Sequence, residues 1–160
     1  MQKCRMRRRG HRLILSAMAA GVLFGAAGGA QAFLGGGTDT VQADGAHFSA
    51  TPVATNYGSY TGYLLTLPNG GTINEFAASG VVFGLSWRTP GRPDLVQLLG
   101  PHFATFQAGF SPPMRGIRRS PPTIAKSDLV IQSRGHPGAF FGRALLPALA
   151  PTGFSLSDLK

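Results

Sequence analysis

Large apolar residues recur at every second position over residues 81–88, and this is the clearest short-period pattern in the chain. The large apolar residues of this segment share one face of the pattern: Val81, Phe83, Leu85 and Trp87. A period of two with one large apolar face predicts a half-buried β-strand. Residues 60–67 and 72–77 are also rich in strand-forming residues, and turn residues such as Asn69-Gly70 separate the segments. The three segments together predict an antiparallel meander.

The period changes to that of an α-helix over residues 94–107. Apolar residues there recur three or four positions apart and form one stripe: Leu95, Leu98, Leu99, Phe103 and Phe106. Asp94 lies where a carboxylate favours the N-terminus of a helix. Gly100-Pro101 interrupts the stripe, and proline within a helix removes a backbone hydrogen bond. We therefore expect one kinked helix or two short ones.

The remaining segments predict a C-terminal hairpin, a loop and an arm. Residues 128–133 and 139–146 are expected to pair as strands, with a loop at residues 134–138. Residues 108–126 are rich in proline and arginine, which is typical of a solvated loop. Residues 33–59 are rich in Gly, Ala, Thr and Ser without a sustained period, and they predict a flexible N-terminal arm.

The order of these elements predicts one α+β domain over residues 60–160. It consists of a small curved antiparallel sheet, made of a three-strand meander and a hairpin, with one kinked helix on a face. Glycine within a strand often marks a bend or a bulge, so Gly62, Gly84 and Gly142 predict curvature. A short helix-like end is expected at residues 155–160.

Residues 1–32 have the three parts of a secretory signal peptide. Basic residues precede an apolar segment at residues 13–27, and small residues follow it, so we expect cleavage between Ala32 and Phe33. An uncleaved membrane anchor is disfavoured because the apolar run is shorter than the roughly 20 residues that span a bilayer. Arg8-Arg9 keeps a twin-arginine route open beside the general secretory route. The chain is therefore expected in the periplasm or outer envelope of a Gram-negative bacterium, or secreted beyond it.

Removal of the signal peptide changes what the composition means. Six of the fifteen basic residues leave, so nine remain against six acidic residues, which is a net charge of +3. This small charge argues against a nucleic-acid partner. The single cysteine, Cys4, leaves as well. The mature chain is therefore expected to have neither a disulfide nor a cysteine metal site.

Neither a metal nor a cofactor is predicted from the remaining motifs. The three histidines of the mature chain, His47, His102 and His136, are not spaced as zinc ligands are. Ser86 lies within a predicted strand and not on the strand-to-helix turn that a hydrolase serine needs. We expect His102 at the boundary of the core.

An enzyme remains one of three alternatives for the function. Its site would gather His136, Arg143 and Glu75, with Asp94 as a further member. The simpler interpretation makes His136 a turn residue and Glu75 an outward strand residue paired with Arg88 or Arg143. The enzyme hypothesis fails if these side chains lie more than about 10 Å apart on separate faces, beyond hydrogen-bond reach.

The leading alternative is a non-enzymatic envelope module that binds an envelope protein or polymer. Trp87 is a candidate for its binding surface, although a tryptophan ending an apolar strand face is more often part of the core. The third alternative binds anionic lipid or polysaccharide through the basic residues of the proline-rich loop: Arg115, Arg118 and Arg119. Otherwise, contact with the membrane is expected only transiently, through the signal peptide.

Three groups of residues match a known pattern. The first is Gly71-Thr72, Glu75-Phe76, Gly80, Val82-Phe83 and Trp87. The second is Pro93-Asp94-Leu95, Leu98-Leu99-Gly100 and Phe103. The third is Ser127-Asp128-Leu129-Val130, Ser133, Gly135-His136, Phe140, Gly142-Arg143-Ala144 and Leu146-Pro147. The chain thus resembles the exported bacterial family catalogued as domain of unknown function 2844, over about residues 34–160, and the resemblance implies a short secreted protein without specifying an activity.

Overall fold

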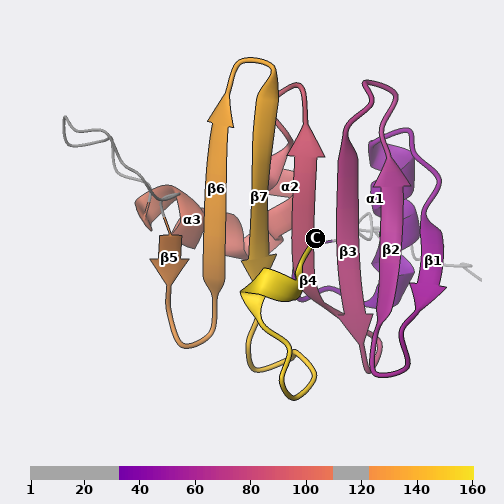
Figure 1. Ribbon diagram of the computed structural model, residues 1–160, viewed down its shortest axis with the longest axis vertical. Helices are drawn as coiled ribbons and strands as arrows, with labels where there is room; N and C mark the ends of the chain where they lie inside the picture. Colours follow the sequence, from indigo (N-terminus) through magenta and orange to yellow (C-terminus); the bar gives the residue numbers. More distant parts are fainter. Residues whose placement is uncertain (1–32, 110–122) are drawn as a thin grey trace, which may run out of the picture.

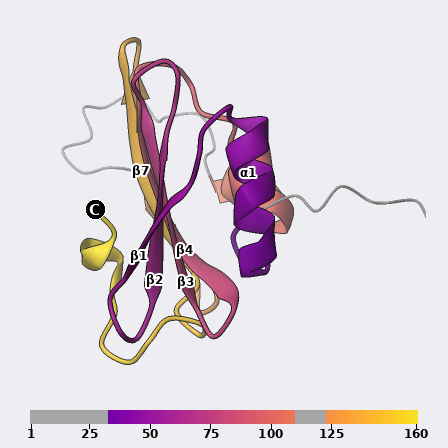
Figure 2. The same ribbon diagram turned by 90° about the vertical axis from the view of Figure 1, so that its right-hand side faces the viewer.

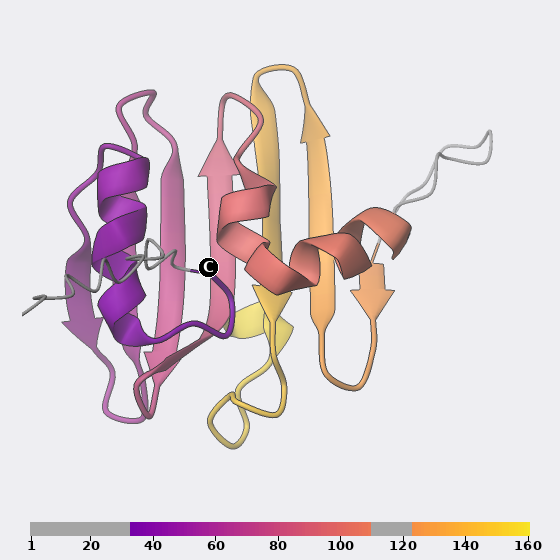
Figure 3. The same cartoon turned by 180° about the vertical axis from the view of Figure 1, so that it is seen from behind.

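The computed structural model describes residues 33–109 and 123–160 as a seven-stranded antiparallel sheet with its α-helices on one face (Figure 1, Figure 3). The strands are β1 (Val53–Asn56), β2 (Thr61–Thr66), β3 (Thr72–Ala78), β4 (Val81–Thr89), β5 (Thr123–Ala125), β6 (Val130–His136) and β7 (Ala139–Leu145). The helices are η1 (Thr38–Thr40), α1 (Val41–His47), α2 (Leu95–Leu99), η2 (Gly100–His102), α3 (Phe103–Gly109) and η3 (Leu156–Asp158).

The sheet order is β1-β2-β3-β4-β7-β6-β5. After β4 the chain crosses one face of the sheet as α2 and α3, and β5 then lies at the far edge. The next strand, β6, pairs with β5, and β7 lies between β6 and β4 and pairs with both. The α+β class of a single domain is therefore confirmed, and the hairpin is present as β6 and β7. The predicted three-strand meander has four strands, β1-β2-β3-β4. The described sheet has seven strands, however, because the short strands β1 and β5 add one strand at each edge.

The stretch over residues 33–59 is not the featureless arm that its composition predicts. It contains η1, α1 and β1, and Leu34 and Val41 are fully buried. The Leu34 N–H donates to the Leu98 carbonyl at 3.0 Å, which ties the segment to α2. A seven-residue helix is too short to be stable alone and depends on packing against the sheet, which a local sequence pattern does not reveal.

The two faces of the sheet carry separate apolar clusters. In the edge-on view, α1 lies on one side of the sheet and the C-terminal segment on the other (Figure 2). Under the helices lie buried residues of β2, β3, β4, β6 and β7: Leu65, Ile73, Leu85, Trp87, Ile131 and Ala144. Against the C-terminal segment lie Phe76, Phe83, Leu145 and Leu159. The expectation that Phe83 shares a face with Leu85 is thus wrong, because the register between β3 and β4 shifts at Phe76/Ala77. Such a bulge adds one residue to a strand and turns its side chain over.

Glycines within the strands make room for side chains of neighbouring elements. A Cβ at Gly84 would lie 2.8 Å from a Leu159 methyl, and a Cβ at Gly142 would overlap the Trp87 ring. The nearest side chain to Gly62 is that of Tyr57, at 3.2 Å from the same constructed position. The strand register runs without a shift through Gly62 and Gly142, whereas Gly84 lies beside the β3–β4 bulge.

The other boundaries differ modestly from expectation. The helix breaks at Gly100-Pro101 as predicted, and Asp94 caps α2 by accepting the Gln97 N–H at 3.1 Å. The β6–β7 turn is shorter than expected and consists of Pro137 and Gly138, since His136 still pairs with Ala139. Part of the expected linker forms β5 and the end of α3. No helix in the described ranges has the length and apolar character that crossing a membrane requires.

Candidate functional site

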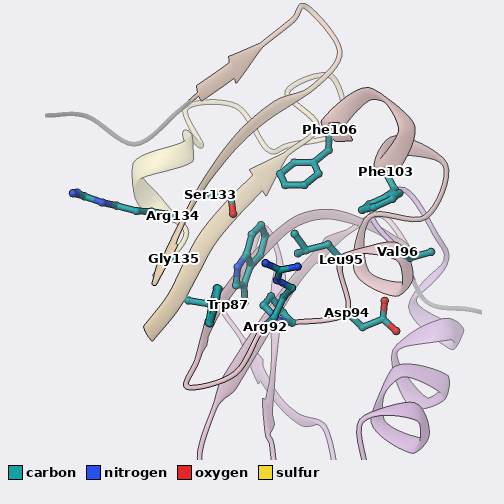
Figure 4. A pocket seen from close by; sticks show the side chains of 12 residues that line it. Trp87, Arg92, Asp94, Leu95, Val96, Phe103, Phe106, Ser133, Arg134 and Gly135 are labelled. Atoms are coloured by element: carbon teal, nitrogen blue, oxygen red, sulfur yellow. The ribbon is translucent and has the colours of Figure 1, made fainter. Parts of the chain in front are cut away.

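An apolar cleft of about 600 Å³ opens between α2, α3 and the strands β4, β7 and β6 (Figure 4). Most of its lining is aromatic or aliphatic, and it is larger than the hollows of about 430 and 440 Å³ on the opposite face of the sheet. The residues around it are Trp87, Arg92, Pro93, Asp94, Leu95, Val96, Phe103, Phe106, Ser133, Arg134, Gly135 and Phe140.

The floor of the cleft is built from two aromatic rings that lie across glycines of the next strand. The Trp87 ring of β4 occupies the space above Gly142 of β7, and Phe140 of β7 occupies the space above Gly135 of β6. Any larger residue at either glycine would overlap the ring. Trp87 is 3% exposed, so it belongs to the core as the sequence favours, and it also lines the cleft.

The opposite wall comes from the apolar stripe of α2 and α3. Phe103 and Phe106 lie one turn apart, with ring centroids separated by 6.0 Å, and both are only partly buried. Val96 at the rim is 59% exposed. Phe103 and Phe106, the last residues of the stripe, line the cleft and are not fully buried in the core. Exposed apolar side chains that gather around a concave surface are characteristic of a binding site.

Charged groups surround the cleft unevenly. Figure 4 shows Arg92 beside Trp87, whereas the Arg134 side chain extends away from the cleft. Asp94 points towards α1, where its Oδ2 lies 3.3 Å from His47 Nε2. Within residues 33–109 and 123–160, Arg92 has no carboxylate within ion-pair distance. The mouth of the cleft therefore presents an available positive charge.

A second unusual feature is a buried pair of carboxyl groups beneath α1. Glu75 of β3 and Asp44 of α1 are each 1% exposed. Gln97 of α2 donates from Nε2 to Asp44 Oδ1 at 2.6 Å. Asp44 Oδ2 and both Glu75 oxygens have no hydrogen-bond partner other than each other's carboxyl group among the described residues. A proton on Glu75 supplies the donor that this pair needs.

Burial and charge both keep that proton in place. Burial, together with the negative charge and the hydrogen bond of Asp44, raises the pKa of the Glu75 carboxyl to about 9. Burial also raises the pKa of Asp44, although the Gln97 hydrogen bond opposes this shift. The pair is thus a proton-sharing acid pair at neutral pH. It joins α1, α2 and β3, and neither residue lines the aromatic cleft.

The structure does not bring the predicted enzyme residues together. Glu75 faces the helices and is buried against Asp44, so it is neither outward-facing nor paired with Arg88 or Arg143. Arg143 faces the opposite side of the sheet, where its Nη1 donates to the Leu156 carbonyl at 3.0 Å. His136 ends β6, and its Nδ1 lies 3.0 Å from the Pro137 carbonyl oxygen. A site made of these three residues is therefore wrong for this fold.

Some of the important residues were not singled out by sequence reasoning. Asp44 lies in the segment interpreted as an arm, and Arg92 lies in a short loop without a motif. The sequence does contain a signal for Phe140. It lies two residues from Gly142, so the two share one face of their strand, as Leu85 and Trp87 do in the neighbouring strand. The basic residues Arg115, Arg118 and Arg119 lie outside the described residues, as do Ala32 and the rest of the predicted signal peptide.

The opposite face of the sheet carries two shallower hollows beside the C-terminal segment. Their volumes are about 430 and 440 Å³, and both include Lys160. The Lys160 carbonyl oxygen accepts hydrogen bonds from Asn74 Nδ2 at 3.0 Å and Ser86 Oγ at 2.9 Å. In the part of the chain that the structure describes, no three His, Cys, Asp or Glu residues are grouped as a metal site.

Comparison with known proteins identifies one relationship. The model of the family described as Protein of unknown function (DUF2844) matches residues 30–159, which confirms the resemblance found from the sequence. No curated protein and no solved structure matches the chain.

Proposed function

The chain belongs to the family described as Protein of unknown function (DUF2844), and we propose that it is an exported envelope protein that acts by binding. The aromatic cleft is its binding site. The proposal rests on one observation: a half-open apolar cleft whose floor of Trp87 and Phe140 is supported by two glycines. Rings that lie across glycines are fixed in place, so the cleft exists before any ligand arrives.

The chemistry of the lining favours binding over catalysis. Its side chains are mainly aromatic and aliphatic, with the cation of Arg92 at the mouth and the hydroxyl of Ser133. Catalysis by proton transfer needs a titratable group within hydrogen-bond reach of the reacting atoms. The Glu75–Asp44 pair is buried beneath α1, where its geometry suits a structural role. An enzyme site near His136, Arg143 and Glu75 finds no support in this arrangement.

The export part of the proposal is carried by the composition of residues 1–32. The order of basic, apolar and small residues is that of a signal peptide. The expected result is a mature protein that begins at Phe33 and accumulates in the periplasm or outer envelope. Intact-mass analysis of the envelope fraction tests this expectation, and a mass that includes residues 1–32 contradicts it.

The single tryptophan makes the binding proposal directly testable. Anilinonaphthalene sulfonate is a suitable probe, because it joins an aromatic body to one negative charge. The protein is purified in the form that accumulates in the cell, and the probe is titrated into it. The probe should quench the fluorescence of Trp87 and accept excitation energy from it. We expect Val96→Glu to weaken this binding by about tenfold, because a carboxylate at the rim repels the sulfonate and offsets Arg92.

A matched control comes from Val53, which is 60% exposed on β1, nearly the same as Val96. Val53→Glu makes the same chemical change away from the cleft and should leave the affinity unchanged. Far-ultraviolet circular dichroism shows whether each variant keeps its fold. Equal affinity in both variants, or no quenching of Trp87 in the native chain, would remove the cleft as a binding site.

A further inference from the structure

Among the residues that the structure describes, β5 covers only half of the sheet edge beside the cleft. β6 has seven residues, whereas β5 has three and pairs only with Val130, Ile131 and Gln132. Within the described ranges, Ser133–His136 therefore has a strand partner on one side only, which is β7. In the sequence, Pro121 and Pro122 precede β5, and proline has no N–H to donate to a neighbouring strand.

The hydrogen bonds fix which backbone groups point towards this open edge. The Lys126 N–H donates to the Leu129 carbonyl at 2.8 Å, so the backbone groups of Leu129 point away from β7. Alternate residues of a strand present their N–H and C=O to the same side. Ser133 and Gly135 therefore also point these groups outwards, and Arg134 directs its own towards β7.

The same alternation places the cleft beside these groups. Ile131 faces the helices, so Ser133 and Gly135 face the same side of the sheet, and both residues line the cleft. A chain segment that adds to this edge would present every second side chain to the helix side. Such a side chain would enter the cleft beside Phe106, over the floor to which Trp87 contributes (Figure 4).

The charge around this edge indicates the character of the segment. Arg92 is available at the mouth, and the exposed Arg134 lies on the edge strand itself. Asp94 is engaged with His47 and with the N-terminus of α2. At the other edge of the sheet, β1 borders a hollow that is lined by one acid, Asp158, and one base, Lys160. That edge therefore does not favour an acidic segment over a basic one.

We propose that the open edge of β6 and the aromatic cleft together bind an extended acidic peptide segment of another envelope protein. The segment adds a strand at Ser133 and Gly135 and inserts an aromatic or large aliphatic side chain into the cleft. This inference rests on the proposed binding function and names its ligand class. Main-chain pairing gives such complexes affinity, and the pocket for alternate side chains gives them specificity. A lipid could fill the cleft, but it would not pair with the outward-pointing N–H and C=O groups of Ser133 and Gly135.

Selection from a library of random peptides displayed on phage tests the inference. The target is the chain in the form in which the cell accumulates it. We expect enrichment of sequences that alternate large apolar with polar residues and carry acidic residues. The most enriched peptide, made synthetically, should quench Trp87. It should also slow hydrogen exchange of the Ser133 and Gly135 amides at least about tenfold, without a comparable change at Arg134, which already points its amide to β7.

Two variants separate strand addition from other modes of binding. Ser133→Pro removes an outward N–H and leaves the hydrogen bonds to β7 intact, as proline at a sheet edge does. It should weaken peptide binding about tenfold or more relative to Ser133→Thr, a variant that changes the same side chain but keeps the N–H. The same peptide with its alternate backbone amides methylated should also lose binding.

The outcomes distinguish this inference from the proposed function. If anilinonaphthalene sulfonate binds the cleft and no peptide is enriched, the peptide inference fails and the binding function stands. If neither binds, both fail. Peptides that bind Ser133→Pro as tightly as Ser133→Thr would overturn strand addition. Dimers of the native chain that Ser133→Pro dissociates would assign the edge to a second copy of the chain and would also overturn the proposal.

Discussion

The buried Glu75 carboxyl makes the stability of the chain depend on pH in an unusual direction. Its pKa is about 9 in the folded chain, raised mainly by burial and further by the charge of Asp44, against an ordinary value of 4.5. Between these two values the folded state holds a proton that the unfolded state has lost. The contribution of Glu75 to stability is therefore fully present below about pH 4.5 and is lost as the pH rises towards 9.

The magnitude follows from the linkage between proton binding and folding. One proton of difference changes the free energy of unfolding by up to about 1.4 kcal/mol for each pH unit. From pH 5.5 to 7.5 the loss is thus about 2.7 kcal/mol, a large part of the roughly 5–15 kcal/mol that stabilises an ordinary domain. The raised pKa of Asp44 acts in the same direction.

Urea denaturation at several pH values, followed by Trp87 fluorescence, measures this slope. In Glu75→Gln the amide cannot ionise, and it can donate to Asp44 Oδ2, the oxygen that otherwise depends on the Glu75 proton. We expect this variant to lose most of the pH dependence and to be more stable than the native chain at pH 7.5. Asp128→Asn, which changes an exposed acid, should keep the native slope. A native chain equally stable at pH 5.5 and 7.5, or an equal slope in Glu75→Gln, would refute the reasoning.

Two further predictions concern the elements around the cleft. Gly142→Ala should destabilise the chain by about 1–3 kcal/mol, because the new methyl group displaces the indole ring of Trp87. The fluorescence emission of Trp87 should then shift to longer wavelength. Gly138→Ala provides a comparison, because a Cβ there meets no atom within 4 Å and only the backbone is strained. Asp94→Ala should cost about 1 kcal/mol in urea denaturation, mostly through the lost cap of α2, since an exposed pair such as His47–Asp94 contributes less. An Asp94→Asn variant that keeps the cap should recover most of the stability, and equal losses in both variants would contradict the assignment to the cap.

The sequence predicted those elements whose patterns are local. The stripe from Leu95 to Phe106 and the break at Gly100 depend on residues within a few turns, and both appear in the structure. The position of Phe83 could not be predicted, because the β3–β4 register shift turns it to the other face. Alternation along one strand carries no information about the partner's register.

The candidate site illustrates the same limit. Trp87 was singled out from the end of an apolar strand face, and it lies both in the core and at the cleft. Glu75 was singled out as well, but its environment was misjudged, because its partner Asp44 lies in a helix of only seven residues. That helix is stabilised by contacts with residues distant in sequence, including Gln97. Patterns within α1 therefore gave no sign of a buried acid pair.

The acid pair and the cleft are connected through α2, although neither Glu75 nor Asp44 lines the cleft. Gln97 in α2 donates to Asp44, and Asp94 at the start of α2 contacts His47. Both contacts join α2 to α1 on the side of α2 that faces away from the cleft. The other side of the same helix gives the cleft Leu95 and Val96. Loss of the Glu75 proton would leave two negative charges buried beneath α1 and would weaken the docking of α1 and α2 together. The wall of the cleft should therefore loosen with rising pH before the sheet unfolds, since β4, β6 and β7 are held by their own hydrogen bonds.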